Sequence, residues 1–176
     1  MTDEAVLMVA KLMELSARTS PKAVGKDFIE VMILSGDGKN ALGKEMIKIA
    51  GERNSPGFKR DGQNVLDSTA IVLIGLLGHP GIGIDCGACG FRSCKEMEAA
   101  EIKGDFRGPN CAHRVADLGI AVGSAAKTAS MHNVDNRIME RAGLAALRLG
   151  IVKSKVAYGI PLSATGKSIF FDRKPI

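Results

Sequence analysis

The 176-residue sequence has no tryptophan, one tyrosine and six phenylalanines, so aromatic side chains supply little of its core. It also has no run of five or six like charges that would form a charged tail. These two shortages argue against a dedicated nucleic-acid binder, because such proteins stack bases on aromatic rings and neutralise phosphates with basic stripes. The core must instead be built from aliphatic side chains, eight methionines and 21 glycines, which suits closely packed helices.

Targeting and membrane signals are missing as well. The chain opens with Met-Thr-Asp-Glu, with neither the basic region nor the apolar stretch of a signal peptide behind it. The longest uncharged stretch, 68–84, is interrupted by Pro80 and several glycines and does not have the pattern of a membrane span. We therefore expect a cytoplasmic protein with reduced cysteines and no membrane partner.

The length and the order of the predicted elements indicate one α+β domain spanning residues 1–176. Apolar spacing predicts helices over 3–17, 40–53, 61–67, 95–103, 112–131 and 134–149. Strands are predicted over 28–34, 69–74, 156–160 and 169–171. The small residues of the 112–131 helix are expected to let another backbone pack closely: Ala116, Gly119, Gly123 and Ala126. The helices should pack on a small central sheet.

All the cysteines of the chain fall between positions 86 and 111, in a C-x2-C-x4-C-x16-C pattern formed by Cys86, Cys89, Cys94 and Cys111. Iron–sulfur clusters take thiolate ligands, and a cluster of four irons takes one terminal ligand on each iron. Three cysteines in one loop can wrap one side of a cluster, and the fourth can return after a helix–turn excursion. The pattern therefore favours a [4Fe–4S] cluster. Gly87 and Gly90 follow the first two ligands, where a missing Cβ lets backbone N–H groups approach sulfur.

Three other interpretations of these cysteines stay open. Zinc also accepts four thiolates, although its sites usually pair two C-x2-C hairpins. Two disulfides conflict with a reducing compartment, and a catalytic thiol does not need three neighbouring cysteines. His113 could replace one cysteine as a ligand, but it is expected to be an exposed polar residue at a helix start. His79 and His132 are expected to be structural, and the nearby acidic side chains to be solvated: Asp85, Glu96 and Glu98.

The run Cys86-Gly-Ala-Cys89-Gly-Phe-Arg-Ser-Cys94, with Cys111 further on, resembles a four-cysteine [4Fe–4S] module. This module occurs in the B subunit of Rnf electron-transport complexes and in the large subunit of the corrinoid iron–sulfur protein. The resemblance spans residues 63–125 and implies that each of the four cysteines ligates one iron. Arg92-Ser93 and Ala112 depart from prolines common in the module, which concerns loop stiffness rather than ligation.

At the scale of the whole chain, the sequence is similar to an uncharacterised family of prokaryotic ferredoxin-domain proteins. The similarity is carried by residues 17–23, 117–125, 134–139 and 159–173. It implies an iron–sulfur cofactor and electron transfer with a redox protein partner, but it specifies no reaction.

A further similarity is to nitroreductase-like flavoproteins, which begin with a helix ending in an Arg-Ser/Thr element and contain a central Asp-Leu-Gly helix. Arg18-Thr19 and Asp117-Leu118-Gly119 match these elements. The similarity implies a homodimeric oxidoreductase in which the cluster passes electrons to a bound FMN. Arg18, Lys167 and Arg173 are then the candidates for holding the flavin phosphate, because a phosphate needs fixed cationic donors.

The sequence therefore predicts an electron carrier with a [4Fe–4S] cluster, a flavin-dependent reductase as the alternative, and a zinc-binding nucleic-acid module as the second alternative. No Ser-His-Asp order or carboxylate pair marks a catalytic residue. The formal charge of +5 also has an explanation in the first case. A cluster with four thiolates carries about two negative charges when oxidised and about three when reduced, which would offset part of the excess of Lys and Arg.

Overall fold

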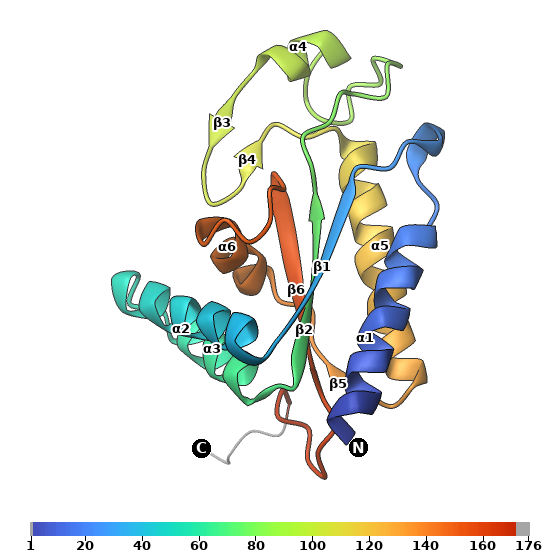
Figure 1. Cartoon of the computed structure of the whole chain (residues 1–176). Coiled ribbons are helices and arrows are strands. Elements are labelled where there is room, and N and C mark those ends of the chain that lie inside the picture. The colour runs from blue at the N-terminus through green and yellow to red at the C-terminus, as the bar shows by residue number, and fades with distance from the viewer. Residues whose placement is uncertain (1, 172–176) are drawn as a thin grey trace.

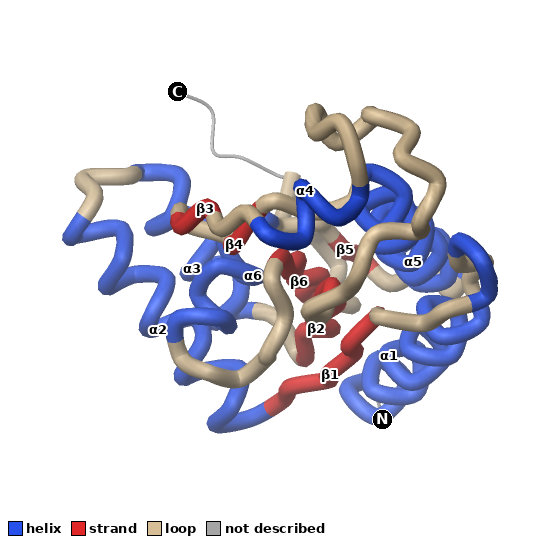
Figure 2. The backbone as a smooth tube through the Cα atoms, turned by 90° about the horizontal axis from the view of Figure 1, so that it is seen from above, coloured by secondary structure: helices blue, strands red, loops and turns tan. Residues whose placement is uncertain are grey.

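A four-stranded antiparallel sheet lies between two layers of helices in the computed structural model, which describes residues 2–171 (Figure 1). The strand order is β1 (Ile29–Ser35), β2 (Ala70–Leu76), β6 (Val156–Ser163) and β5 (Asp135–Asn136). One face is covered by α1 (Thr2–Thr19) and α5 (Ala112–Met131). The other face is covered by α2 (Gly36–Glu52), α3 (Pro56–Asp67) and α6 (Glu140–Arg148), as Figure 2 shows from above. This mixed architecture confirms the α+β prediction.

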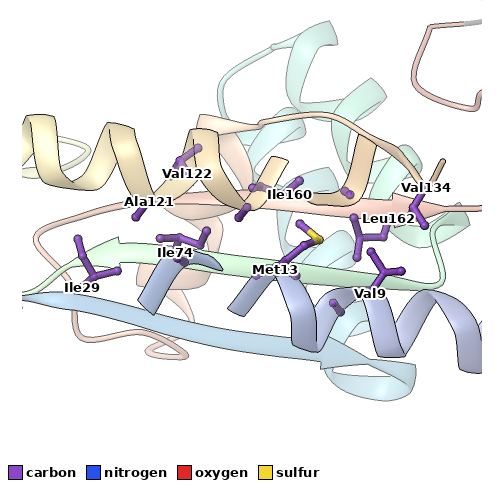
Figure 3. Close-up of a cluster of buried hydrophobic side chains, with 14 of the residues drawn as sticks. Val9, Met13, Ile29, Ile74, Ala121, Val122, Val134, Ile160 and Leu162 are labelled. Atoms are coloured by element: carbon purple, nitrogen blue, oxygen red, sulfur yellow. The ribbon is translucent and has the colours of Figure 1, made fainter. Parts of the chain in front are cut away.

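The central strand β2 is buried along its whole length because helices cover both of its faces. Its side chains alternate, so Ile71 and Leu73 enter the α2–α3–α6 core while Val72 and Ile74 enter the α1–α5 core. Figure 3 shows the α1–α5 core, in which Met13 of α1 lies among aliphatic side chains of the sheet. The continuous apolar sequence of β2 is thus explained by burial on both sides.

Two glycines bring α6 onto β6. A Cβ at Gly143 would overlap the backbone carbonyl of Ala157 on the strand. A Cβ at Gly159 would lie 2.7 Å from the Cβ of Ala142 and 2.8 Å from Cδ1 of Ile71. The two backbones therefore approach closely at this point, and only the absence of side chains permits it.

Three of the four small residues predicted to let another backbone pack closely face the surface instead, while Ala126 is half-buried against the α1–α5 core. Ala116, Gly119 and Gly123 are exposed, and a Cβ added at either glycine would meet nothing within 4 Å. α5 packs on α1 and the sheet through a different stripe, which includes Leu118, Ala121 and Ala125. The prediction placed small residues in a helix correctly but assigned them to the wrong face.

Several element boundaries also differ from the predictions. The helix predicted over 40–53 begins four residues earlier, at Gly36, as α2. The helix predicted over 95–103 ends at Ala99 as α4 (Cys94–Ala99), and the chain continues as the hairpin β3 (Ile102–Lys103) and β4 (Arg107–Gly108). The helix predicted over 134–149 begins at Glu140, because residues before it pair with β6 as strand β5 and a bridge. Residues 169–171 form a turn rather than a strand.

Within residues 2–171, none of the helices combines the length and the apolarity needed to cross a bilayer.

Candidate metal centre

The four cysteines lie in one connection between β2 and α5, which we call the cysteine segment (residues 77–111). It leaves the sheet at the end of β2, at the top of Figure 1, and contains a long loop, α4 and the β3–β4 hairpin. Figure 2, which looks down on this end, shows the loop beside α4 and α5. All four cysteines are free thiols: Cys86 is exposed, Cys89 and Cys94 are half-buried, and Cys111 is buried.

The Cys86–Gly90 turn depends on two glycines. Gly87 has φ +72° and Gly90 has φ +86°, in the left-handed region where a side chain is strained. The N–H of Gly90 donates to the carbonyl of Gly87 across 2.9 Å, which closes the turn between Cys86 and Cys89. The glycines predicted to let N–H groups approach sulfur thus also have a conformational reason to be glycine.

Three acidic side chains brace the loop. The N–H of Cys94 donates to Oδ1 of Asp85 across 2.7 Å. The N–H of Gly81 donates to Oε1 of Glu98 across 2.7 Å, and that of Arg92 donates to Oε2 of Glu96 across 3.0 Å. These carboxylates are exposed, as expected, but they also hold backbone donors in place, a role that the sequence did not reveal.

Cys94 begins α4 and lies directly over Gly81. A Cβ built on Gly81 would be 2.9 Å from the sulfur of Cys94, so the glycine leaves the room that this thiol occupies. The turn before α4 is fixed by Ser93, whose Oγ accepts the N–H of Glu96 across 3.1 Å. Cys94, the third predicted ligand, therefore has its place set by Gly81 on one side of the loop and by the Ser93 cap on the other.

Cys111 and the residue that contacts Cys86 both belong to the start of α5. Cys111 is the N-cap residue of this helix and is 4% exposed. The sulfur of Cys86 lies 3.7 Å from Nε2 of His113, in the first turn of the same helix. His113 is half-buried against Cys86 rather than exposed as expected. The first turn of α5 contains no acidic residue, and the positive end of a helix dipole favours thiolates.

The donor set has the chemistry that an iron–sulfur cluster requires, namely four free thiols on one segment, and sulfur ligands suit iron–sulfur centres. Among residues 2–171, no three His, Cys, Asp or Glu side chains surround one point closely enough to hold a single ion. Cluster ligands bind separate irons and need not converge on one point. The residues therefore fit a cluster by their chemistry and by their common segment.

Beneath the cysteine segment lies a buried cation that sequence reasoning missed. Arg114 is 1% exposed, and its guanidinium stacks over the ring of Phe28 with 4.8 Å between Cζ and the ring centroid. Its Nη1 donates to the carbonyls of Ala23 (2.9 Å) and Lys26 (3.1 Å) and to Oδ2 of Asp117 (3.2 Å). Its Nε and Nη2 are buried and find no acceptor among the described residues. The sequence around Arg114 does not set it apart from other arginines, because its burial depends on residues that are distant in the chain.

His79 connects this layer to the segment above it. Its ring meets Phe28 edge-on at 6.2 Å between centroids, and its Nε2 lies 3.1 Å from Oδ1 of Asn110, the residue before Cys111. Burial lowers the pKa of His79 from its ordinary value, so the ring is held in the neutral form. The expectation of a structural role agrees with these contacts.

The residues predicted to hold a flavin phosphate are not brought together within one chain. Nη1 of Arg18 donates to the carbonyl of Ile29, which pairs with the last residue of β2, and also contacts Asp27. Lys167 is exposed and follows β6, whose end pairs with the start of β2. The two cations therefore lie at opposite ends of the sheet. Arg173 lies outside the described residues.

A basic cleft of about 320 Å³ lies between the β3–β4 hairpin and α6. Its lining carries one carboxylate, Asp105, and four cations: Arg53, Arg107, Arg148 and Lys155. Arg53 and Arg148 are paired with carboxylates, whereas within residues 2–171 no acidic side chain pairs with Arg107 or Lys155. Nζ of Lys155 donates instead to the carbonyl of Pro109 across 3.1 Å, two residues before Cys111.

Solved structures with the same architecture define the class of fold. Nitroreductase CinD from Lactococcus lactis, in complex with chloramphenicol, aligns with a TM-score of 0.60, 14% identity, and coverage of 91% of this chain and 78% of that one. A nitroreductase with bound FMN from Desulfitobacterium hafniense aligns with a TM-score of 0.57 and 11% identity, covering 91% of this chain and 78% of that one. The FMN-dependent nitroreductase NfnB from Mycobacterium smegmatis, in complex with NADPH, aligns with a TM-score of 0.56 and 11% identity, covering 96% of this chain and 83% of that one. The fold is therefore nitroreductase-like, as the sequence similarity suggested.

The family follows from sequence. A family model described as "Uncharacterized protein containing a ferredoxin domain (DUF2148)" matches residues 107–173, which include Cys111. An "Uncharacterized protein" from Archaeoglobus fulgidus is 47% identical over 174 residues, covering 98% of this chain and 94% of the relative. The chain belongs to this family of ferredoxin-domain proteins. The finer resemblance to the Rnf and corrinoid-protein modules stays a prediction.

Proposed function

We propose that this protein binds one [4Fe–4S] cluster through Cys86, Cys89, Cys94 and Cys111 and acts as a one-electron carrier. The observation that carries the proposal is the placement of four free thiols on one connection, with Cys86 against the helix start that Cys111 caps. The ferredoxin domain in the family description supports an iron–sulfur role in electron transfer. The cysteines and the loop around them (within the predicted module, 63–125) would form the binding unit.

The cluster, when bound, supplies a centre that accepts and releases one electron without making or breaking a bond in the protein. The four thiolates would hold it, and Gly81 leaves the space for the sulfur of Cys94. The helix start of α5 and the buried Arg114 place positive charge near an anionic group. Phe91, half-buried in the loop, would limit the access of water. Exposed Cys86 gives a partner an approach to the centre.

The test is metal and sulfide analysis of protein prepared without oxygen, together with its visible spectrum. We expect a brown protein with about four irons and four sulfides per chain. Cys111→Ala should lose most of the iron, whereas His132→Ala, a histidine outside the cysteine segment, should keep it. A colourless protein with one zinc would contradict the proposal and favour the zinc-module alternative. Salt-sensitive binding to DNA or RNA would then be the next measurement.

The partner proposed for this carrier is an acidic redox protein. The basic cleft opens beside the hairpin that leads to Cys111, and Arg107 and Lys155 have no acidic partner among residues 2–171. Complementary charge raises association rates and makes them sensitive to salt. Arg107→Glu should therefore slow electron transfer to an acidic ferredoxin by tenfold or more at low salt. Lys127→Glu, an exposed change on α5, is the matched control and should have little effect; equal rates in both variants would overturn the docking site.

A flavin-dependent reductase is the second candidate, and the shared fold with FMN-containing nitroreductases is the observation that favours it. Because Arg18 and Lys167 lie at opposite ends of the sheet, a single chain does not bring them to one phosphate. This function therefore requires a homodimer in which a second copy completes the site. FMN titration followed by fluorescence, combined with the molecular mass in solution, tests it. A monomer that leaves FMN fluorescence unchanged would remove this candidate.

A further inference from the structure

We propose that Arg114 is a positioning residue that raises the reduction potential of the cluster by placing a fixed, buried positive charge beside Cys111. This inference rests on the proposed cluster. The observation behind it is that Nε and Nη2 of a guanidinium only 1% exposed have no acceptor within residues 2–171. The charge itself is paired with Asp117, but buried donors are normally hydrogen-bonded as well, and these two find no acceptor in the polypeptide described.

Arg114 lies in the first turn of α5, the same end of the helix as the thiol of Cys111. Cys111 caps α5 and Arg114 is three residues further on, so both lie on the same helix face, about 5–6 Å apart at Cβ. Both residues are buried, at 4% and 1% exposure. The orphaned donors therefore belong to the side chain that neighbours the most buried of the proposed ligands.

Asp117 does not cancel this charge at the cysteine end. It follows Arg114 by another three residues on the same face, so the order along the helix is Cys111, Arg114, Asp117. Its Oδ2 accepts a hydrogen bond from Nη1 of the arginine and from neither of the other guanidinium nitrogens. Its Oδ1 accepts the N–H of Ala23 across 2.8 Å. Counted along the helix, the cation belongs to a residue about one turn from Cys111 and the carboxylate to a residue about two turns away. On that basis the positive charge of the pair acts more strongly at Cys111 than the negative one.

Arg114 also fixes the rest of the layer beneath the cysteine segment. Nη1 ties down the carbonyls of Ala23 and Lys26, and Phe28 lies between the guanidinium and His79. A merely structural arginine would make these same contacts. The two roles differ in one measurable respect, because holding a loop does not change how a charge on the cluster is stabilised.

The expected direction follows from charge. Reduction adds one negative charge to the cluster, so a nearby buried cation favours the reduced form and raises the potential. Removing the cation should change the ratio of reduced to oxidised cluster, at a fixed applied potential, by roughly tenfold, which equals about 59 mV for a one-electron couple. In such a titration, dithionite supplies the electron that the cluster accepts.

The experiment compares potentials of iron-loaded variants by dye-mediated titration followed in the visible spectrum. Arg114→Met should lower the potential, Arg114→Lys should stay near the wild type because it keeps the charge, and Asp117→Asn should raise it. Lys39→Met, which removes a buried cation on the other face of the sheet, is the matched control and should leave the potential unchanged. If Arg114→Met does not fold, Arg114→Gln, which removes the charge but keeps hydrogen-bond donors, takes its place and should also lower the potential.

The outcomes separate this inference from the proposed function. A wild-type protein that binds no iron under anaerobic conditions would overturn the proposed function, and this inference with it. A fully loaded Arg114→Met or Arg114→Gln protein with the wild-type potential would overturn the role of Arg114 alone, and would leave the cluster in place.

Discussion

The two helical layers each bury one basic side chain, and the two cations are treated differently. Lys39 of α2 is 4% exposed, and its Nζ donates to the carbonyls of Val65 (3.0 Å) and Leu66 (2.6 Å) at the end of α3. Arg114 of α5 keeps two buried donors without acceptors in the described part of the chain. The α2–α3 layer therefore completes its own polar contacts, whereas the end of the molecule around the cysteines leaves contacts for something else.

The same contrast holds for the sheet and the cysteine segment as wholes. β2 is buried between two continuous cores, and close approach at Gly143 joins α6 to β6. The cysteine segment has exposed turns and three carboxylates that brace its backbone. It also has three glycines with positive φ, where a side chain would be strained: Gly83, Gly87 and Gly90. Changes in the sheet and its helices should thus alter stability, and changes in the segment should alter what the protein binds.

The largest effect is expected from Gly143→Ala. The added methyl would overlap the backbone of Ala157, and since the obstacle is main chain, α6 must move away from β6. We expect a loss of about 3 kcal/mol in the free energy of unfolding, measured by denaturant titration. Gly119→Ala is the control, because its methyl points into open space on α5 and should stabilise the helix by up to about 1 kcal/mol. Similar midpoints for both variants would refute the close contact.

The next effect concerns removal of iron from the loaded protein with a chelator and oxidant. Amide hydrogen exchange within residues 77–111 should accelerate by roughly tenfold, because a bound ligand stabilises only the conformation it binds. A tenfold change corresponds to a loss of about 1.4 kcal/mol in the free energy of local opening. Amides of β2 and β6 should keep their protection, since Phe106 is the one side chain of the segment that packs against either core and it is only partly buried. Uniform acceleration along the whole chain would erase the distinction between the two regions.

Lys39 gives a smaller, pH-dependent effect. Burial lowers the pKa of Lys39 from 10.5, so in the alkaline range below 10.5 the unfolded chain binds the proton more readily than the folded one. The lysine's contribution to stability therefore rises with pH through that range and is complete above 10.5. The difference in unfolding free energy between wild type and Lys39→Met should change with pH in this direction. A difference that is constant with pH would mean that Lys39 is not desolvated.

The smallest effect is expected at the ion pair between Arg53 and Asp105, which ties the β3–β4 hairpin to the end of α2. The two donor–acceptor distances are 2.6 and 2.7 Å, but the side chains are 40% and 46% exposed. Exposed pairs contribute about 0–1 kcal/mol, so Asp105→Asn should change the unfolding free energy by less than about 1 kcal/mol. A loss of several kcal/mol would show that the hairpin is part of the folded core.

The parts of the fold that strong local patterns define could be predicted from the sequence. α5 runs over 112–131 as predicted, and β2 was recognised from its unbroken apolar run. The segment 134–139 was predicted as helix, yet pairing with β6 converts it into β5 and a bridge. Such pairing joins residues far apart in the sequence, so it overrides local propensity and leaves no local signal.

The candidate site also has features that the sequence predicts and features that it does not. Spacing alone predicts the four cysteines as one set and marks Gly87 and Gly90 as glycines that follow ligands, whereas their role in closing the turn is evident only from the backbone. Arg114 could not be distinguished among 24 lysines and arginines, because its burial depends on Phe28 and on the loop after α1. The bracing carboxylates were likewise identified only by their backbone partners.

The chain leaves the sheet at Leu76, passes through all four cysteines and returns as α5 at Ala112. The proposed cluster site is consequently carried by one inter-element connection, which adds no strand to the four-stranded sheet and contributes only the partly buried Phe106 to the packing of the two cores. Such a connection can be exchanged or shortened during evolution while the α/β/α sandwich stays intact. The scaffold and its chemistry can therefore have separate histories within one short polypeptide.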